Sequence, residues 1–340
     1  MDAIGVDTHK DTLAACLVDE LGTALDERTF ANDPTGHRAL LDWASASSEA
    51  TIGVEGSSSF GAPAARFLIA SGRVVREVPP QLSRRERIRT RRPGKSDPTD
   101  ALAIARVTAR EHELPPVRLV DASLEIQLLV EAREDVVAET TRVRNRLHAD
   151  LRVLAPGYGA TAANLTAVRH RATVARLLRR LDGIQPELAR TRLARLRALA
   201  AEEHALAVRI ADRVAGHPLL ELPGAGVLVT AKLIGEVGDI GRFRSSDAFA
   251  ALAGVAPIPA SSGQTQRMRL NRGGNRQLNR ALYTIALAQA WHHPPAKAYI
   301  AKKRAEGKSW REAIRALKRQ LVRTVFRLLQ TGARSLVEAA

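Results

Sequence analysis

Short apolar runs dominate the first third of the chain and predict β-strands. Three short strands are expected at residues 3–7, 12–18 and 24–30, of which the first two are rich in Ile, Val, Leu and Ala, and Glu20-Leu21-Gly22 supplies a hairpin turn. Further strands are expected at 51–55 and 73–78, with helices at 34–47 and 58–71. Pro79-Pro80 ends the last strand, and a basic loop is expected to follow it.

This order of elements predicts a mixed α/β sheet. Three strands followed by alternating helices and strands are typical of a ribonuclease-H-like fold. Such a fold places acidic residues on its first strand, its fourth strand and a later helix.

The middle of the chain changes to the spacing of long amphipathic helices. Leu129, Val136 and Val143 repeat every seven residues within 124–154, and a second apolar stripe follows 186–214 in steps of three and four. These two segments predict a coiled-coil hairpin, with an ordinary helical bundle as the open alternative.

The last third is expected to be mainly helical, with a helix at 277–290. The turn Pro223-Gly224-Ala225-Gly226 joins two helical stretches and predicts a helix-hairpin-helix, unless it is an ordinary tight turn. We therefore expect three domains, at residues 1–120, 121–215 and 216–340.

Four acidic residues fall where this fold would gather them. Asp7 follows Ile4-Gly5-Val6, and Glu55 follows Ile52-Gly53-Val54, so both are expected at strand tips. Asp97 and Asp100 open a helix three residues apart and share one helical face. Crowded carboxylates favour a hard divalent cation, Mg²⁺ or Mn²⁺.

Each acid also has an ordinary structural explanation. Asp97-Pro98 is a favourable helix start, Asp7 could cap a turn, and Glu55 could be a solvated loop residue. The shared setting of all four nevertheless favours a metal-dependent enzyme that acts on nucleic acid.

The net charge and its distribution along the chain also favour nucleic acid as the partner. The chain of 340 residues has a net charge of +16, and residues 261–340 hold 17 Lys or Arg but only three acids. Such a one-sided field attracts polyanions, although a charge run can also be merely solvated. Aromatic residues make up only 4% of the chain, so base stacking is expected to contribute little. The candidate nucleic-acid contacts are Lys10, Arg84, Arg85, Arg89, Arg91, Arg92, Lys95, Gly224, Gly226, Arg267, Arg269, Arg272, Asn275 and Arg276.

The remaining composition indicates a cytoplasmic, nucleoid-associated protein. A single cysteine, Cys16, excludes a disulfide framework and a cysteine zinc site. No run of 18 apolar residues predicts a membrane span, and the early charges Asp2, Asp7 and Lys10 do not fit a signal peptide.

Ser262 is a further candidate for chemistry. Ser261-Ser262-Gly263 lies in a positively charged segment. The default role of Ser-Ser-Gly is a turn. A serine there could instead be a nucleophile, with neighbouring arginines neutralising the phosphate that it attacks.

Taken in order, these motifs resemble the DEDD-type insertion-sequence transposases of the IS one-ten family, which includes the IS eleven-eleven branch. The resemblance spans nearly the whole chain. Its motifs are Gly5-Val6-Asp7 with Lys10, Val54-Glu55-Gly56, Lys95-Ser96-Asp97-Pro98-Thr99-Asp100-Ala101, Leu222-Pro223-Gly224-Ala225-Gly226, Gly235-Glu236-Val237-Gly238-Asp239-Ile240 with Arg242-Phe243, and Ser262-Gly263 ahead of Gly274-Asn275.

The resemblance implies a RuvC-like catalytic domain, a coiled-coil section and a C-terminal transposase domain. It implies that Asp7, Glu55, Asp97 and Asp100 bind Mg²⁺ and that Ser262 forms a covalent link to DNA. Ser261 doubles the serine and leaves open which hydroxyl attacks. Thr8-His9 ahead of Lys10 is a modest departure from the family pattern.

The resemblance also implies partners. Some relatives use a structured bridge RNA that pairs with target and donor DNA, and they assemble as tetramers. We therefore expect DNA, a bridge RNA and a homo-oligomer, from dimer to tetramer, and no membrane.

Three functions follow from these expectations. The first is a DNA transposase or recombinase that excises and integrates an insertion sequence using metal and serine. The second is a RuvC-type junction nuclease in which water attacks. The third is a nucleic-acid-binding protein without catalysis.

Overall fold

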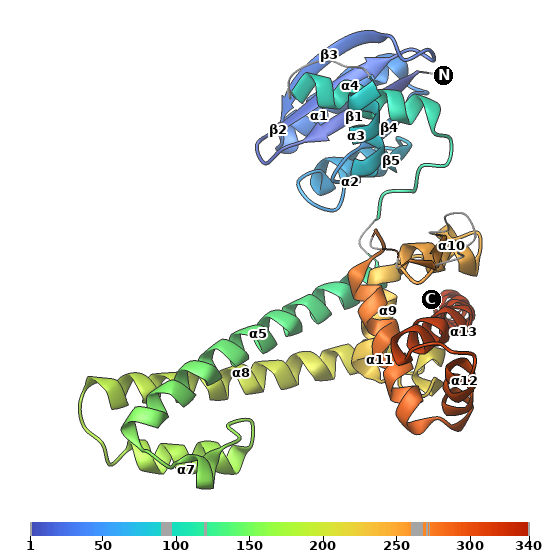
Figure 1. Ribbon diagram of the computed structural model, residues 1–340. Coiled ribbons are helices and arrows are strands. Elements are labelled where there is room, and N and C mark those ends of the chain that lie inside the picture. Colours follow the sequence, from blue (N-terminus) through green and yellow to red (C-terminus); the bar gives the residue numbers. More distant parts are fainter. Residues whose placement is uncertain are drawn as a thin grey trace. The chain divides into compact units, whose positions relative to one another are not determined.

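The computed structural model describes residues 2–89, 97–118, 121–259, 268–269, 271 and 273–338. The chain divides into two compact units, residues 1–119 and 120–340, and each is considered by itself (Figure 1). The expected division into three domains stays a prediction.

The first unit is built on a five-stranded mixed sheet. Its strands are β1 (Ala3–Thr8), β2 (Thr12–Val18), β3 (Ala24–Ala31), β4 (Thr51–Val54) and β5 (Val75–Glu77), in the order β3-β2-β1-β4-β5. The first three strands pair antiparallel, whereas β1, β4 and β5 pair in parallel. This topology confirms the expected mixed α/β sheet with the strand order of a ribonuclease-H-like fold.

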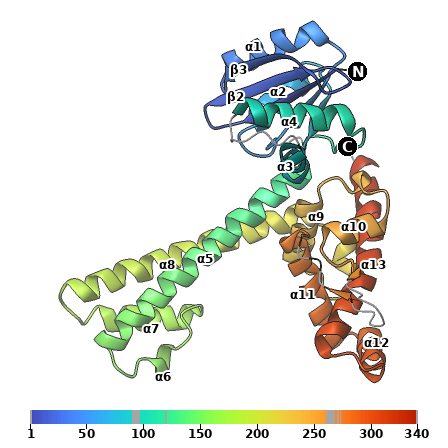
Figure 2. The same cartoon turned by 45° about the horizontal axis from the view of Figure 1, so that its top comes forward.

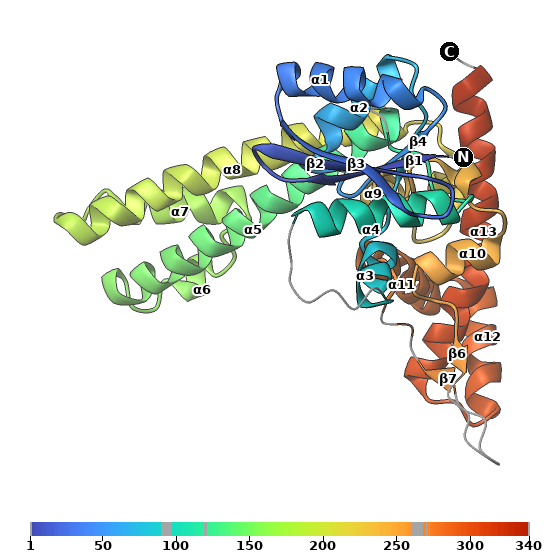
Figure 3. The same ribbon diagram turned by 90° about the horizontal axis from the view of Figure 1, so that it is seen from above.

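Helices cover both faces of the sheet. The helices α1 (Pro34–Ala44), which continues into the 3-10 helix η1 (Ser45–Ser47), and α2 (Ala62–Ala70) pack on one face, where Ile4, Val6 and Ile52 join their core. The helix α4 (Asp97–Arg110) covers the other face and buries Ala3 and Cys16 (Figure 3). Alternate residues of a strand therefore belong to different layers.

Two glycines bring the α4 backbone against the sheet. A Cβ at Gly5 would lie 2.1 Å from the nitrogen of Ala105 and 2.3 Å from the oxygen of Ala101. A Cβ at Gly53 would lie 1.9 Å from Oγ1 of Thr108. Only glycine permits this approach, since no side chain fits between the layers.

Two local predictions in this unit were wrong. Residues Pro80–Arg89 form the helix α3 rather than a loop, because proline suits the first turn of a helix and Ser83 and Glu86 are buried. The helix expected from residue 58 begins at Ala62, because a turn that starts with Gly56 at φ 77° comes first.

Two long helices dominate the second unit. The helices α5 (Ala122–Leu154) and α8 (Ile184–Val214) lie side by side (Figure 1). Four ion pairs cross between them and show that they run antiparallel, because partners pair early residues of one helix with late residues of the other. The pairs are Glu125–Arg213, Arg133–Glu203 (2.6 Å), Glu139–Arg195 (2.8 Å) and Asp150–Arg192.

We call residues 122–214 the arm. Its far end contains the helices α6 (Gly159–Ala162) and α7 (Val168–Leu178), which the sequence did not predict. A separate core there joins Leu151 and Leu165 to Leu193. The paired helices match the expected hairpin, and a coiled coil stays a prediction.

The near end of the arm shares one core with the C-terminal helices. Ile126 of α5 and Ile210 of α8 pack with the later elements in a single cluster. These elements are η2 (Pro218–Glu221), α9 (Val227–Val237), η3 (Ile240–Arg242), α10 (Ser246–Leu252), α11 (Arg276–His292), α12 (Pro294–Ala305) and α13 (Trp310–Glu338), with a strand pair of β6 (Ile258–Pro259) and β7 (Met268–Arg269).

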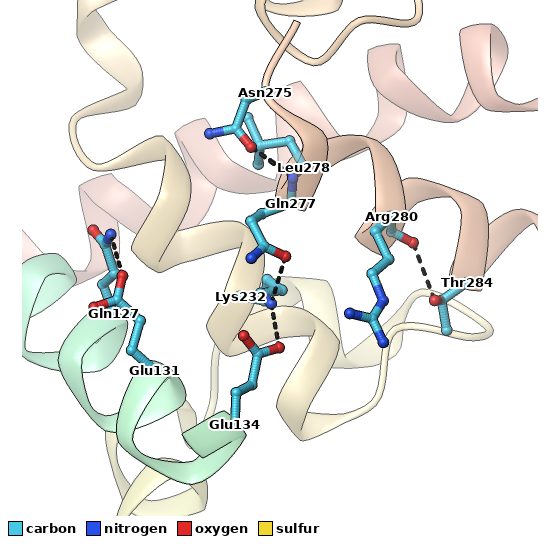
Figure 4. Close-up of polar contacts among 9 residues, drawn as sticks. All are labelled: Gln127, Glu131, Glu134, Lys232, Asn275, Gln277, Leu278, Arg280 and Thr284. Carbon is cyan, nitrogen blue, oxygen red and sulfur yellow. Dashed lines mark hydrogen bonds and ion pairs between the residues drawn. The ribbon is translucent and has the colours of Figure 1, made fainter. Parts of the chain in front are cut away.

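A buried lysine joins three helices at this near end. Lys232 of α9 is only 9% exposed, and its Nζ donates to Oε1 of Gln277 on α11 (2.9 Å) and to Glu134 on α5 (Figure 4). A buried ammonium group requires such partners, because desolvation would otherwise be costly. The contact fixes the arm to the C-terminal helices.

The glycine-rich turn before α9 packs against α11. Gly224 has a positive φ of 88°, and a Cβ there would lie 2.9 Å from the Cβ of Ala288. Nε2 of Gln289 donates to the carbonyl of Pro223 (2.9 Å). The element before the turn is the short 3-10 helix η2. A helix-hairpin-helix that contacts phosphate through Gly224 and Gly226 therefore stays a prediction.

Among the described residues, no helix is long and apolar enough to cross a membrane.

Candidate active site

Two expected acids lie at the ends of neighbouring parallel strands: Asp7 is near the end of β1, and Glu55 directly follows β4. Val6 of β1 is in register with Val54 of β4, and the nitrogen of Glu55 donates to the oxygen of Val6 (3.2 Å). Oγ1 of Thr8 donates to the carbonyl of Glu55 (2.9 Å). Because Ala3 and Gly5 face α4, strand alternation places Asp7 on that same face.

The third acid comes from α4 itself. Asp100 lies in the first turn of this helix and is only 5% exposed. Nη1 of Arg87, on α3, lies 2.7 Å from its Oδ1. The buried carboxylate of α4 is therefore compensated by the guanidinium group of Arg87 on the neighbouring helix α3.

The carboxylates of Glu55 and Asp100 are close enough to affect the pKa of Asp7. Burial raises the pKa of Asp7, and the negative charges of Asp100 and Glu55 raise that pKa further. His9 lowers the pKa of Asp7, because its Nε2 lies 3.2 Å from Oδ2 of that residue. Like charges held together in this way favour protonation or a bound cation.

Glu55 is oriented by a serine of α3. Oγ of Ser83 donates to Oε2 of Glu55 (2.6 Å) and also contacts the carbonyl oxygen of Pro80 (3.2 Å). Ser83 is fully buried. The unexpected helix α3 therefore supplies partners to two of the three acids.

The donor atoms suit a hard cation. Oδ2 of Asp7 and Oδ1 of Asp100 are buried, and the described groups beside them are the side chains of His9 and Arg87. Carboxylate oxygens are the ligands that Mg²⁺ prefers. Within the described part of the chain, however, no three His, Cys, Asp or Glu residues are arranged to hold a metal ion. Asp97 begins α4, but its side chain lies outside the described residues.

The candidate nucleic-acid contacts are scattered. Lys10, Arg84, Arg85 and Arg276 are exposed, and Arg89 is largely exposed, with Nη1 3.7 Å from the buried carboxylate of Glu86. The side chain of Arg269 and all of Arg91, Arg92, Lys95, Ser261, Ser262, Arg267 and Arg272 lie outside the described residues.

Asn275 has a structural role in the described contacts. Its Oδ1 accepts from the nitrogens of Gln277 and Leu278 and so caps α11 (Figure 4). Its Nδ2 donates to Oε2 of Glu236 (2.8 Å). Contact with nucleic acid stays a prediction for this residue.

Glu77 is a further half-buried acid at this edge of the sheet, and its residue pattern alone did not mark it as a candidate. This residue ends β5, the third parallel strand, and is in register with Val54. Its Oε2 accepts from the nitrogen of Ser57 (3.2 Å) and from the Ser57 hydroxyl. Burial raises the pKa of Glu77 to about 7. Its position near the end of the expected strand 73–78 was the available signal.

Glu77 should make the stability of the first unit depend on pH. Its folded pKa of about 7 exceeds the ordinary 4.5, so its stabilising contribution is complete below pH 4.5 and is lost as pH rises through 7. We expect the wild type to lose more unfolding free energy than Glu77→Gln between about pH 5 and about pH 8, measured by urea unfolding.

The exposed Glu49 offers a matched control. Glu49→Gln should keep the wild-type pH profile. Parallel profiles for the wild type and Glu77→Gln would contradict the prediction.

Comparisons with known proteins agree with the motifs. A family model described as "Transposase" matches residues 4–156, and one described as "Transposase IS116/IS110/IS902 family" matches residues 216–301. The "Insertion element IS110 uncharacterized 43.6 kDa protein" of Streptomyces coelicolor is 31% identical over 70% of this chain and 71% of that protein. The "Insertion element IS900 uncharacterized 42 kDa protein" of Mycobacterium paratuberculosis is 28% identical over 97% of this chain and 96% of that protein.

Among solved structures, the chain matches T. thermophilus RuvC in complex with Holliday junction substrate at 18% identity and a TM-score of 0.28. That match covers 34% of this chain and 99% of the other. The two family models match segments in the first half and in the last third of the chain, and they confirm the resemblance drawn from its motifs. The chain belongs to the IS116/IS110/IS902 family of transposases.

Proposed function

We propose that this chain is a DNA transposase that excises and integrates an insertion sequence by metal- and serine-dependent strand cleavage and exchange. One observation supports the proposal: in a member of a transposase family, Asp7 on β1 is within electrostatic reach of Glu55, which follows the parallel strand β4, and of Asp100 on α4. The site would act on the nucleoid in the cytoplasm.

The acids would hold a divalent cation, Mg²⁺ or Mn²⁺. Asp7, Glu55 and Asp100 would provide oxygen ligands, with Asp97 as the fourth residue of the set. Bound there, the cation would neutralise charge on the phosphate oxygens during strand cleavage.

The chain's own residues prepare this site. Ser83 holds one oxygen of Glu55, and Arg87 lies against Asp100. Both come from the side of α3 that faces the acids, while Arg84 and Arg85 of the same helix are exposed. The exposed arginines would attract the DNA backbone toward the carboxylates.

Ser262 would be the nucleophile. Its oxygen would bond to the phosphorus of the cleaved linkage, and the sugar oxygen would leave with a proton. The phosphodiester is exchanged rather than hydrolysed, so the strand can be rejoined without an external energy source. The family motif Ser262-Gly263 supports this role.

A bridge RNA would choose the sequences that are joined. The family resemblance supports this step, together with the low aromatic content of 4% and the net charge of +16. A protein of this composition would read backbone and shape, while base pairing would supply specificity. A homo-oligomer, from dimer to tetramer, would assemble the complete site.

Removal of the acids should abolish strand cleavage. We expect Asp7→Asn and Asp100→Asn each to lower excision at least about 100-fold, because even outer residues of metal sites commonly cost 10- to 100-fold. The effect is measured as excision of the element from a plasmid, repeated over a range of Mg²⁺ concentrations.

The exposed acid Asp42 gives the control, and Asp42→Asn should excise normally. If Asp7→Asn and Asp100→Asn also retain wild-type excision, the chain is a binding protein or its site lies elsewhere.

Ser262 should form a covalent adduct with DNA. With a labelled donor duplex, denaturing gels should show a protein–DNA adduct that Ser262→Ala removes and Ser261→Ala retains, because only the attacking oxygen can form the bond. Cleavage by Ser262→Ala without an adduct would indicate a junction nuclease that uses water. Loss of the adduct in Ser261→Ala alone would transfer the role to Ser261.

A guide RNA should copurify with the full chain. Sequencing of bound RNA is expected to recover one structured species encoded beside the element, and ribonuclease treatment should abolish recombination, because pairing supplies the specificity. Recombination that survives ribonuclease, in a preparation without RNA, would refute guidance and leave the acid and serine roles intact.

A further inference from the structure

The far end of the arm carries a large excess of positive charge. Residues 151–200 hold ten arginines, no lysine and only two acids, Asp182 and Glu187, so their net charge is 10 − 2 = +8. That is half of the net charge of +16 of the whole chain. This surface is distinct in sequence from the basic C-terminal segment and from the acids of the first unit.

Part of this charge lines a groove between α7 and α8. The groove has a volume of about 510 Å³, and both helices lie together at the far end of the arm (Figure 2). Its small and apolar lining residues are Ala172, Ala175, Leu193 and Ala194. The remaining lining residues are all arginines: Arg176, Arg179, Arg190 and Arg197. We call it the arginine groove.

One of the four arginines maintains the fold. Nη1 of Arg190 donates to the carbonyl oxygens of Leu178 (2.8 Å) and Leu181 (3.0 Å). These carbonyls follow the end of α7, where helical hydrogen bonds run out. Arg190 of α8 therefore holds the end of α7 against α8.

The other three arginines are available to a partner. Arg176, Arg179 and Arg197 are exposed, and none forms an ion pair with any described acid. Arg176 has only a 3.4 Å contact with Oγ1 of Thr173. By contrast, nearby arginines of the same arm are paired, as in Arg192–Asp150 and Arg195–Glu139.

Uncompensated guanidinium groups around a shallow floor favour a phosphate backbone. Guanidinium groups bind phosphate oxygens through paired, charge-assisted hydrogen bonds. The small lining residues leave room for a strand to approach, and the lining contains no aromatic, Asn or Gln side chain that would add stacking or an adenine contact. A second copy of the same surface would be repelled by its identical charge.

We propose that the arginine groove binds the phosphate backbone of duplex DNA, independently of sequence. DNA is favoured over RNA because a transposase family requires a DNA substrate, whereas an RNA partner is only proposed. The groove would hold flanking DNA and orient it during strand exchange. This role does not depend on the metal or the serine.

Charge removal within the groove tests the proposal. In the full chain, the triple variant Arg176→Gln, Arg179→Gln, Arg197→Gln should bind a fluorescent duplex roughly tenfold more weakly at low salt. The plot of log affinity against log salt should become shallower, with the magnitude of its negative slope smaller by about 2 to 3, since each phosphate contact contributes about 0.9. Arg190 is left unchanged so that α7 stays in place.

A matched triple variant controls for net charge. Arg142, Arg146 and Arg209 are exposed on α5 and α8 but do not line the groove. Their replacement by Gln removes the same charge from the same arm and should change duplex affinity much less. Equal losses in both triple variants, or a loss seen only with an RNA hairpin, would overturn the proposal.

Cross-linking gives a readout that does not depend on these variants folding well. Ala194 is an exposed lining residue of the groove, and the single native cysteine, Cys16, is buried. Ala194→Cys labelled with a benzophenone maleimide should cross-link to duplex DNA, and unlabelled duplex should compete. The absence of a cross-link under saturating duplex would also overturn the proposal.

Discussion

The contact between α4 and the sheet is the constraint on which the candidate site depends. At Gly5 and Gly53 the helix lies so close to β1 and β4 that no Cβ would fit. This separation brings Asp100 from the helix within electrostatic reach of Asp7 and Glu55 at the strand ends. A larger residue at either glycine would move the helix and its acid together. The glycines are therefore part of the site, although they carry no functional group.

Such a cluster is costly unless its charge is balanced. The structure balances it through α3, which places Arg87 against Asp100 and the Ser83 hydroxyl against Glu55, while His9 lies beside Asp7. The same helix exposes Arg84 and Arg85 on its solvent side. A segment that looks like a simple basic run thus combines support of the carboxylates with a surface suited to polyanions.

In the second unit, contacts at both ends and along its length hold the long arm in place. At the near end, Lys232 ties α5, α9 and α11 together within the shared core. Along the arm, ion pairs connect α5 to α8, and a small core closes the far end. Exposed ion pairs each contribute little to the free energy of unfolding, so the hydrophobic cores provide most of the stability of the arm. Charges left without partners, as in the arginine groove, then stand out as candidates for binding.

Local patterns in the chain were enough for the strands, the two long helices and the family. Apolar runs that end in Asp7 and Glu55 identify strand tips, because burial alternates along a strand whatever lies next to it. They were not enough for α3, whose single buried face is hidden in a basic run, or for Glu77, whose partner Ser57 lies twenty residues away. The arginine groove was likewise invisible, since its walls come from separate helices. Periodicity records how each segment meets the core. Which segments then face one another depends on packing between residues distant in sequence. Among the described residues, that packing decided which acids lie near one another and which arginines have no acidic partner.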